Sequence, residues 1–188
     1  MSKDSVDPMR TYAWIGLGLL CVQMAEQSLQ SAIQTVLDDE DVRLAEQSEP
    51  ERKQTLGDFL KRLKKRVKLP VHFKEELYTF LRMRNQLVHE FDFKLGTDEG
   101  RKASNLFTQE LAFRAISITG LMMTIFQASA RDEYGEEFYD KNSFPEMENE
   151  HMQQMLKFFE QHHGALAREI LAGRNKVLSK IKTRVRSR

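Results

Sequence analysis

The stretch LFTQELAFRAISITGLMMTIF, residues 106–126, holds the densest run of apolar side chains in the chain. Its large apolar residues recur at intervals of three and four, which is the period of a helix face and not the alternation of a strand. We therefore expect a helix from about Asp98 to Arg131 at the centre of the core. The residues expected to form this centre are Leu106, Leu111, Phe113, Ile116, Ile118, Leu121, Met122, Ile125 and Phe126.

The rest of the chain shows the same helical period, and strand-like alternation never lasts more than a few residues. Polar, turn-rich runs at residues 38–54 and 132–150 predict surface loops. The other expected helices are residues 7–37, a segment from Thr55, a segment from Pro70 that ends before Gly96 and Thr97, and a segment from near Pro145 to the C-terminus. We therefore predict one all-α domain over residues 1–188, an up-and-down bundle of about five helices.

The charge balance limits the kinds of partner that this chain can bind. Its 29 Lys and Arg residues nearly balance its 28 Asp and Glu residues, so the formal net charge is +1 at pH 7. Proteins that bind nucleic acid over a whole surface normally carry a clear basic excess, so a nucleic-acid site here must be a local patch.

Cysteine usage and the apolar stretches predict the compartment. The single Cys21 cannot form an intrachain disulfide, and no Cys/His spacing offers four zinc ligands, so we expect a cytoplasmic protein with no metal or cofactor. Residues 1–10 mix charges of both signs and lack the apolar core of a secretion signal. The apolar stretches 12–25 and 115–130 fall short of the ~18 to 20 residues that cross a bilayer, so we expect core helices and no membrane association.

The most informative segment is LRMRNQLVHEFDF, residues 81–93. The apolar stripe of its helix, Phe73, Leu77, Phe80, Leu87 and Phe91, passes through Arg84. An arginine on an apolar seam needs a counter-charge or an interface, because an unpaired buried charge costs several kcal/mol. Asn85 and His89 are four residues apart and share a helix face, so Asn85 can orient the imidazole. Arg84 and His89, five apart, point about 140° away from each other on one helix.

The run Arg84-Asn85-Gln86-Leu87-Val88-His89 resembles the R-N-x-x-x-H signature of HEPN domains, an all-helical family of ribonucleases and related proteins. The preceding TLGDFL, residues 55–60, is similar to the start of the helix before that motif, so the resemblance covers roughly residues 55–93. It implies an HEPN-like fold and a metal-independent endoribonuclease. It also implies a homodimer that brings the motifs of two chains together.

In HEPN ribonucleases the arginine and the histidine are the catalytic pair, so the resemblance assigns catalysis to Arg84 and His89, with Asn85 orienting the site. His can exchange a proton near neutral pH and Arg can stabilise charge on the reacting phosphate. The expected products carry a 2′,3′-cyclic phosphate and a 5′-hydroxyl.

The resemblance also implies a setting, the toxin or effector of a toxin–antitoxin or phage-defence system, with an antitoxin or regulatory protein as a further partner. One position departs from the pattern. In the subgroup paired with a nucleotidyltransferase antitoxin, a tyrosine that the antitoxin modifies lies two residues after the histidine, and Phe91 stands there in this chain. Membership of that subgroup is therefore not expected.

Two basic segments are candidates for contact with RNA. One lies just before the motif helix, where such a cluster could guide RNA by phosphate contacts or could simply be a solvated helix face. Its residues are Lys61, Arg62, Lys64, Lys65, Arg66 and Lys68. The other is the C-terminal tail from about Arg174, which carries no acidic residue and favours a solubilising role.

A second hypothesis needs no catalysis. The segment around Gly57 and Arg62-Leu63-Lys64 is also similar to the mannitol operon repressor family, all-helical regulators that lack the Arg-to-His spacing found here. The chain would then be a regulator or adaptor that binds a protein or a nucleic acid. A metal site at His162 and His163 is not expected, because adjacent residues on a helix diverge by about 100°.

Overall fold

The structure, a computed structural model of the whole chain, describes residues 6–36, 69–89, 93–135 and 150–186. These residues form four helices and no strand, which confirms the all-α prediction for the described ranges. The helices are α1 (Pro8–Thr35), α4 (Val71–His89), α5 (Asp98–Tyr134) and α7 (Glu150–Arg186). The helix expected from Thr55 and the loop expected at 38–54 lie outside the described residues.

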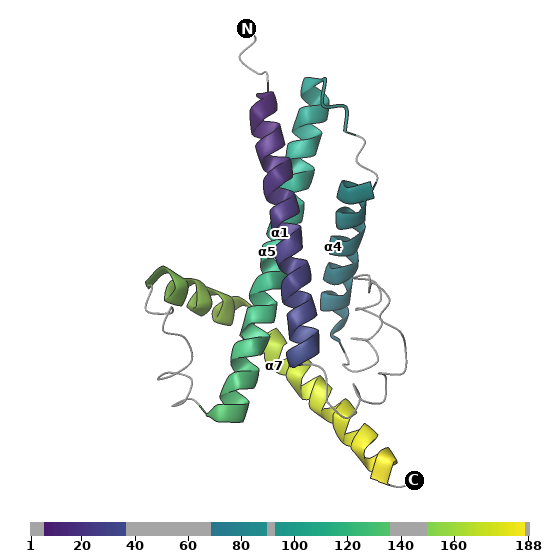
Figure 1. Cartoon of the computed structure of the whole chain (residues 1–188), viewed down its shortest axis with the longest axis vertical. Coiled ribbons are helices and arrows are strands. Elements are labelled where there is room, and N and C mark those ends of the chain that lie inside the picture. Colours follow the sequence, from purple (N-terminus) through teal and green to yellow (C-terminus); the bar gives the residue numbers. More distant parts are fainter. Residues whose placement is uncertain (1–5, 37–68, 90–92, 136–149, 187–188) are drawn as a thin grey trace.

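Helices α1 and α5 lie side by side and run in the same direction, and their contact is the most extensive in the molecule (Figure 1). The α1 residues Val22, Ala25 and Leu29 fall at helical spacing and are all buried. The α5 side chains that complete this core are Leu111, Ala112, Ala115, Ile118, Leu121, Met122 and Ile125.

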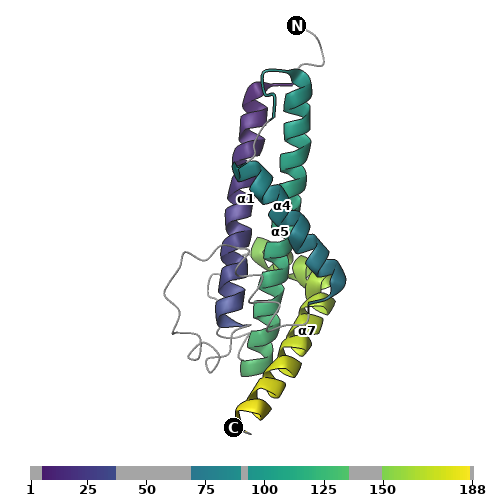
Figure 2. The ribbon, with the colours of Figure 1, turned by 90° about the vertical axis from the view of Figure 1, so that its right-hand side faces the viewer.

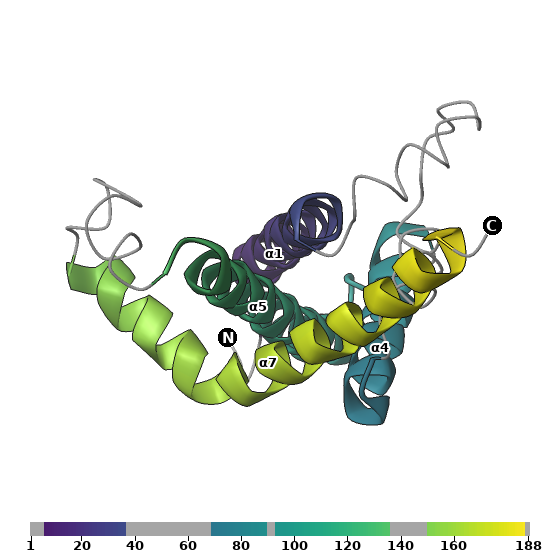
Figure 3. The same ribbon diagram turned by 90° about the horizontal axis from the view of Figure 1, so that it is seen from below.

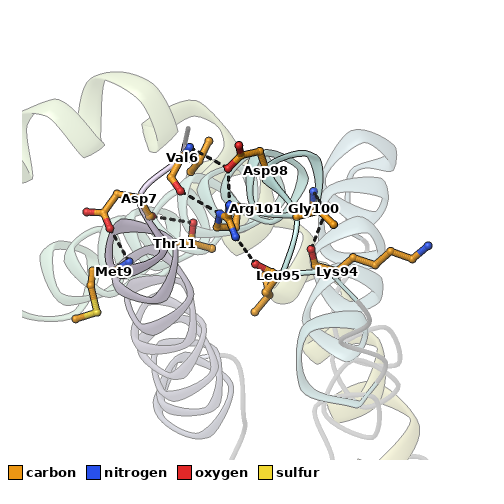
Figure 4. Close-up of polar contacts among 10 residues, drawn as sticks. Val6, Asp7, Met9, Thr11, Lys94, Leu95, Asp98, Gly100 and Arg101 are labelled. Atoms are coloured by element: carbon orange, nitrogen blue, oxygen red, sulfur yellow. Dashed lines mark hydrogen bonds and ion pairs between the residues drawn. The ribbon is translucent and has the colours of Figure 1, made fainter. Parts of the chain in front are cut away.

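Polar contacts fasten the paired N-terminal ends of α1 and α5 (Figure 4). Asp7 caps α1 by accepting from the Met9 amide, and Thr97 caps α5 by accepting from the Gly100 amide. Arg101 then joins the two helices, because it donates to the Val6 carbonyl oxygen at 3.0 Å and pairs with Asp98. These contacts set the register in which α1 lies along α5.

Helices α4 and α7 cover different parts of this pair. Figure 2 shows α4 crossing obliquely over α1 and α5, and α4 runs in the opposite direction to α5, which follows it after residues 90–97. Figure 3 shows α7 on the side of α5 away from α1. Farther along, Arg174 of α7 donates to the Val36 carbonyl oxygen at 2.6 Å, so the first arginine of the predicted basic tail caps the C-terminal end of α1.

Part of the predicted core of α5 is wrong. Leu106, Phe113 and Ile116 are exposed, the first two by about 70% of their surface. They lie on the face that α7 covers farther along, at Gly120, where Phe159 of α7 is close. Exposed apolar residues also occupy the outer side of α1, and they are Met9, Tyr12, Leu17, Leu19, Leu20 and Met24.

The apolar part of α5 is longer than the sequence comparison with a membrane span had assumed. The charge-free run 115–130 is short, but the helical range Asp98–Glu133 contains an 18-residue window that is apolar enough to cross a bilayer. Just over half of that window, 56%, is buried inside the molecule. Length and composition alone therefore fit two kinds of helix, a span and the central helix of a core.

Candidate functional site

The candidate site lies on α4, whose buried face is built from apolar residues at intervals of three and four. Phe73, Leu77, Phe80 and Leu87 are buried as expected, but the position between Phe80 and Leu87 is filled by Met83. Arg84 therefore lies at the edge of the buried face and not on the seam itself. Met83 lies three residues after Phe80 and Arg84 lies four residues after it, and both intervals fit a helix face. Spacing alone therefore did not decide which of the two continues the buried face.

Arg84 has the counter-charge that its position requires. Its Nε donates to Glu26 Oε1 of α1 at 2.7 Å, and the two side chains are 25% and 28% exposed. Its Nη1 donates to Asn85 Oδ1 at 3.1 Å. The guanidinium is thus held between α1 and its own neighbour on α4.

Asn85 and His89 lie on the exposed side of α4, and the exposed Tyr78 and Arg82 belong to the same side. The shared face expected for Asn85 and His89 is present, and His89 lies in the last turn of the helix. Because Arg84 turns toward α1, the arginine and the histidine of one chain point in different directions. The Asn85 side-chain oxygen links to Arg84, where the sequence had suggested a link to the imidazole.

A second ion pair holds the other side of α4. Arg114 of α5 donates from Nη1 to Glu76 Oε2 at 2.7 Å and from Nη2 to Glu110 Oε1 at 2.8 Å. The hydrogen bonds that Arg114 donates to Glu110 and Glu76 raise the pKa of Arg114 above its ordinary value. Helix α4 therefore has one cross-helix ion pair to each of the two central helices.

Sequence reasoning missed Glu26, Glu76 and Arg114. Glu26 is the first charged residue after a run of 15 uncharged positions, 11–25, and it lies between Val22 and Leu29 of the buried stripe. The available signal was that Glu26 borders one apolar stripe and Arg84 borders another, with opposite charges. Only the packing of α1 against α4 shows that the two meet.

The predicted RNA-binding cluster of Lys61, Arg62, Lys64, Lys65, Arg66 and Lys68 lies outside the described residues. The chain enters the described region again at the buried Leu69, two residues before the start of α4 at Val71. His89 is at the opposite end of this 19-residue helix, about 27 Å from Val71 at 1.5 Å per residue.

The remaining histidines form no metal centre in the described ranges, where no group of three His, Cys, Asp or Glu residues could hold an ion. His162 Nδ1 lies 2.7 Å from the Phe158 carbonyl oxygen, and its ring is 4.0 Å from the Phe158 ring. His163 is half-buried near Phe159, and burial, together with the nearby His162, lowers the pKa of His163 below its ordinary value.

Comparison with known proteins adds no relative: no family model, no curated protein and no solved structure matches this chain.

Proposed function

We propose that this chain is a metal-independent endoribonuclease of HEPN type, with Arg84, His89 and Asn85 as its catalytic residues. The observation that carries the proposal is the arrangement of the R-N-x-x-x-H motif on α4. Asn85 and His89 are open to a substrate, and Asn85 is linked to the Arg84 guanidinium. The fold proposed is an HEPN-like bundle of about five helices.

In the proposed reaction His89 removes the proton of a ribose 2′-hydroxyl, and the resulting oxygen attacks the adjacent phosphorus. The bond from phosphorus to the 5′-oxygen breaks, and protonated His89, now acting as a general acid, gives that oxygen a proton as it leaves. Arg84 stabilises the negative charge that develops on the phosphate oxygens. The products are a 2′,3′-cyclic phosphate and a 5′-hydroxyl.

The divergent directions of Arg84 and His89 within one chain favour a site made by two copies. In a homodimer with the motifs near a two-fold axis, His89 of one copy can meet a phosphate held by Arg84 of the other. Cleavage per chain should then fall when the protein is diluted below its dissociation constant. The basic cluster at 61–68 is proposed to guide RNA to this site by phosphate contacts.

The test is an RNA cleavage assay in EDTA with Arg84→Ala and His89→Ala. Loss of a general base or of the charge-stabilising group should lower kcat at least about 100-fold. Matched controls are His72→Ala, an exposed histidine on the same helix, and Arg114→Ala, the other cross-helix arginine of this region. Cleavage that survives both motif substitutions at equal folding would exclude this mechanism.

The proposed setting follows from the same resemblance. A small cytoplasmic ribonuclease of this kind would act as the toxin or effector of a toxin–antitoxin or phage-defence system, held in check by an antitoxin or regulatory protein. A constitutively active form should then be hard to express alone, and the His89→Ala variant should be easy to express.

One observation favours the second candidate, a non-catalytic regulator or adaptor. Arg84 already has a structural role, because it pairs with Glu26 and ties α4 to α1. If the wild-type protein cleaves no RNA and binds a partner equally well after Arg84→Ala and His89→Ala, the chain is a binding module.

A further inference from the structure

The Arg84 guanidinium is held on two of its three nitrogen atoms by residues of two different helices. Glu26 of α1 accepts from Nε at 2.7 Å, and Asn85 of α4 accepts from Nη1 at 3.1 Å. Within the described ranges Nη2 makes no hydrogen bond, and the side chain keeps 25% of its exposure. The two contacts thus fix the plane of the group, and among the described residues Nη2 is neither hydrogen-bonded nor a buried atom without a partner.

This geometry has a specific consequence for binding a phosphate. A free arginine side chain has many rotamers, and a ligand that fixes it must oppose the lost conformational entropy. An arginine already fixed by protein contacts binds with its donors in place, which is the advantage of a preorganised site. Glu26 accepts on the Nε side, so the remaining donors of Nη1 and Nη2 are available to a phosphate oxygen.

We propose that Glu26 is the positioning residue for Arg84, holding the guanidinium so that Nη2 meets a phosphodiester oxygen of the RNA. The inference rests on the proposed function, since it assigns the partner of the same arginine. It adds to the site a residue from α1, 58 positions away from Arg84 in the sequence.

Ion pairs as exposed as this one contribute little to stability, so the role of Glu26 can be separated from folding. The chain offers a matched control in Glu76, which also joins α4 to a central helix through an arginine at 2.7 Å. The side chains of the Arg114–Glu76 pair are 26% and 36% exposed, close to the values for Arg84 and Glu26. Glu76→Ala should therefore reproduce any loss of packing without touching the motif.

The first experiment follows the Arg84 Nε–H group by NMR relaxation in the full-length protein, with exposed Arg82 of the same helix as the mobile reference. We expect a restrained Arg84 in the wild type and in Glu76→Ala, and a mobile one in Glu26→Ala. At saturating inorganic phosphate, where both proteins are fully occupied, the Arg84 signals of the wild type should shift more than those of Glu26→Ala. A mobile Arg84 in the wild type, a restrained one in Glu26→Ala, or no phosphate response would each overturn the inference.

The second experiment measures cleavage kinetics. A misplaced guanidinium should lower kcat of Glu26→Ala by about 10- to 100-fold. KM should not rise, because the substitution also removes a negative charge near the phosphate. Glu26→Gln keeps an oxygen that can accept from Nε, so its kcat should lie closer to that of the wild type. Equal kcat values for Glu26→Ala and Glu76→Ala would overturn the inference.

The two experiments separate this inference from the proposed function. A wild-type protein that cleaves no RNA, yet holds Arg84 through Glu26 and binds phosphate there, refutes the ribonuclease and supports the positioning role. Cleavage that requires Arg84 and His89 but is unchanged in Glu26→Ala supports the ribonuclease and refutes the positioning role.

Discussion

Arg84 shows how a charge can lie at the edge of a core. It follows the buried Met83 in the sequence, its guanidinium meets Glu26, and its side chain is 25% exposed. The pair escapes the full cost of desolvation, and its net contribution to stability is about 0 to 1 kcal/mol. Such a pair therefore contributes little to the stability of the fold, and its main effect is to fix the position of the guanidinium.

The need for a counter-charge was predictable from the sequence, but the identity of that partner was not. The apolar spacing of α4 predicted that Arg84 would need one. Glu26 lies on α1, and a contact between residues 58 positions apart depends on how the two helices pack. The shared helix face of Asn85 and His89, by contrast, follows from the local helix period and was predicted.

A pH dependence is expected from His163, whose folded-state pKa is lowered below the ordinary value of 6.5 by burial and by His162. Between the folded pKa and 6.5 the unfolded chain binds more protons, so the free energy of unfolding rises with pH in that window. Stability should be complete above pH 6.5 and fall as the pH drops toward the folded value. Urea unfolding of the wild type and His163→Gln at pH 7.5 and 5.5 measures this.

The quantity to compare is the change in the free energy of unfolding between pH 7.5 and pH 5.5, because the substitution can also change packing at both pH values. The loss from pH 7.5 to 5.5 should be smaller in His163→Gln than in the wild type. His72→Gln, at an exposed site on α4, is the control and should keep the wild-type loss. An equal loss in all three proteins would mean that His163 is hydrated in both states.

At the scale of the element, the contact of α5 with α7 depends on a glycine. A Cβ at Gly120 would lie 2.4 Å from Phe159 Cδ1, and Phe159 is itself buried. Alanine gains about 1 kcal/mol of helix propensity, but overpacking costs about 1 to 3 kcal/mol. We expect Gly120→Ala to lower the free energy of unfolding by about 1 kcal/mol, as measured by chemical denaturation.

Gly16 supplies the opposite case within the same molecule. It is exposed in the middle of α1, and a Cβ there would meet nothing within 4 Å. Gly16→Ala should therefore raise the free energy of unfolding by about 0.5 to 1 kcal/mol. If both alanines stabilise the protein equally, α7 does not lie on α5 at Gly120.

The ends of the helices were more predictable than their faces. Asp7 and Thr97 cap α1 and α5 through contacts with amides two and three residues away, and such local signals can be read from the sequence. The buried face of α5 could not be read in this way, because Leu106, Phe113 and Ile116 continue an apolar stripe that is covered only farther along the helix. Which part of a stripe is covered depends on where α7 crosses.

At the scale of the whole molecule, α1 and α5 present an extended apolar surface. Helix α1 has no charge from Thr11 to Ala25, and several of its large side chains point away from α5. A helix that is apolar on all sides is typically buried on all sides. In the described structure one side of this helix is open, so substitutions on its two sides should have very different effects.

Leu29 and Leu20 test this difference directly. Leu29 is 1% exposed and faces the core, so Leu29→Ala should lower the free energy of unfolding by about 2 to 5 kcal/mol. Leu20 is 53% exposed, so Leu20→Gln should change it by no more than about 0.5 kcal/mol. Chemical denaturation at two protein concentrations gives both values.

If Leu20→Gln instead costs as much as a core substitution, the Leu20 side chain is covered in solution. A cost that disappears on dilution would then identify a second copy of the chain as the cover, because mass action weakens an association but leaves contacts within one chain unchanged.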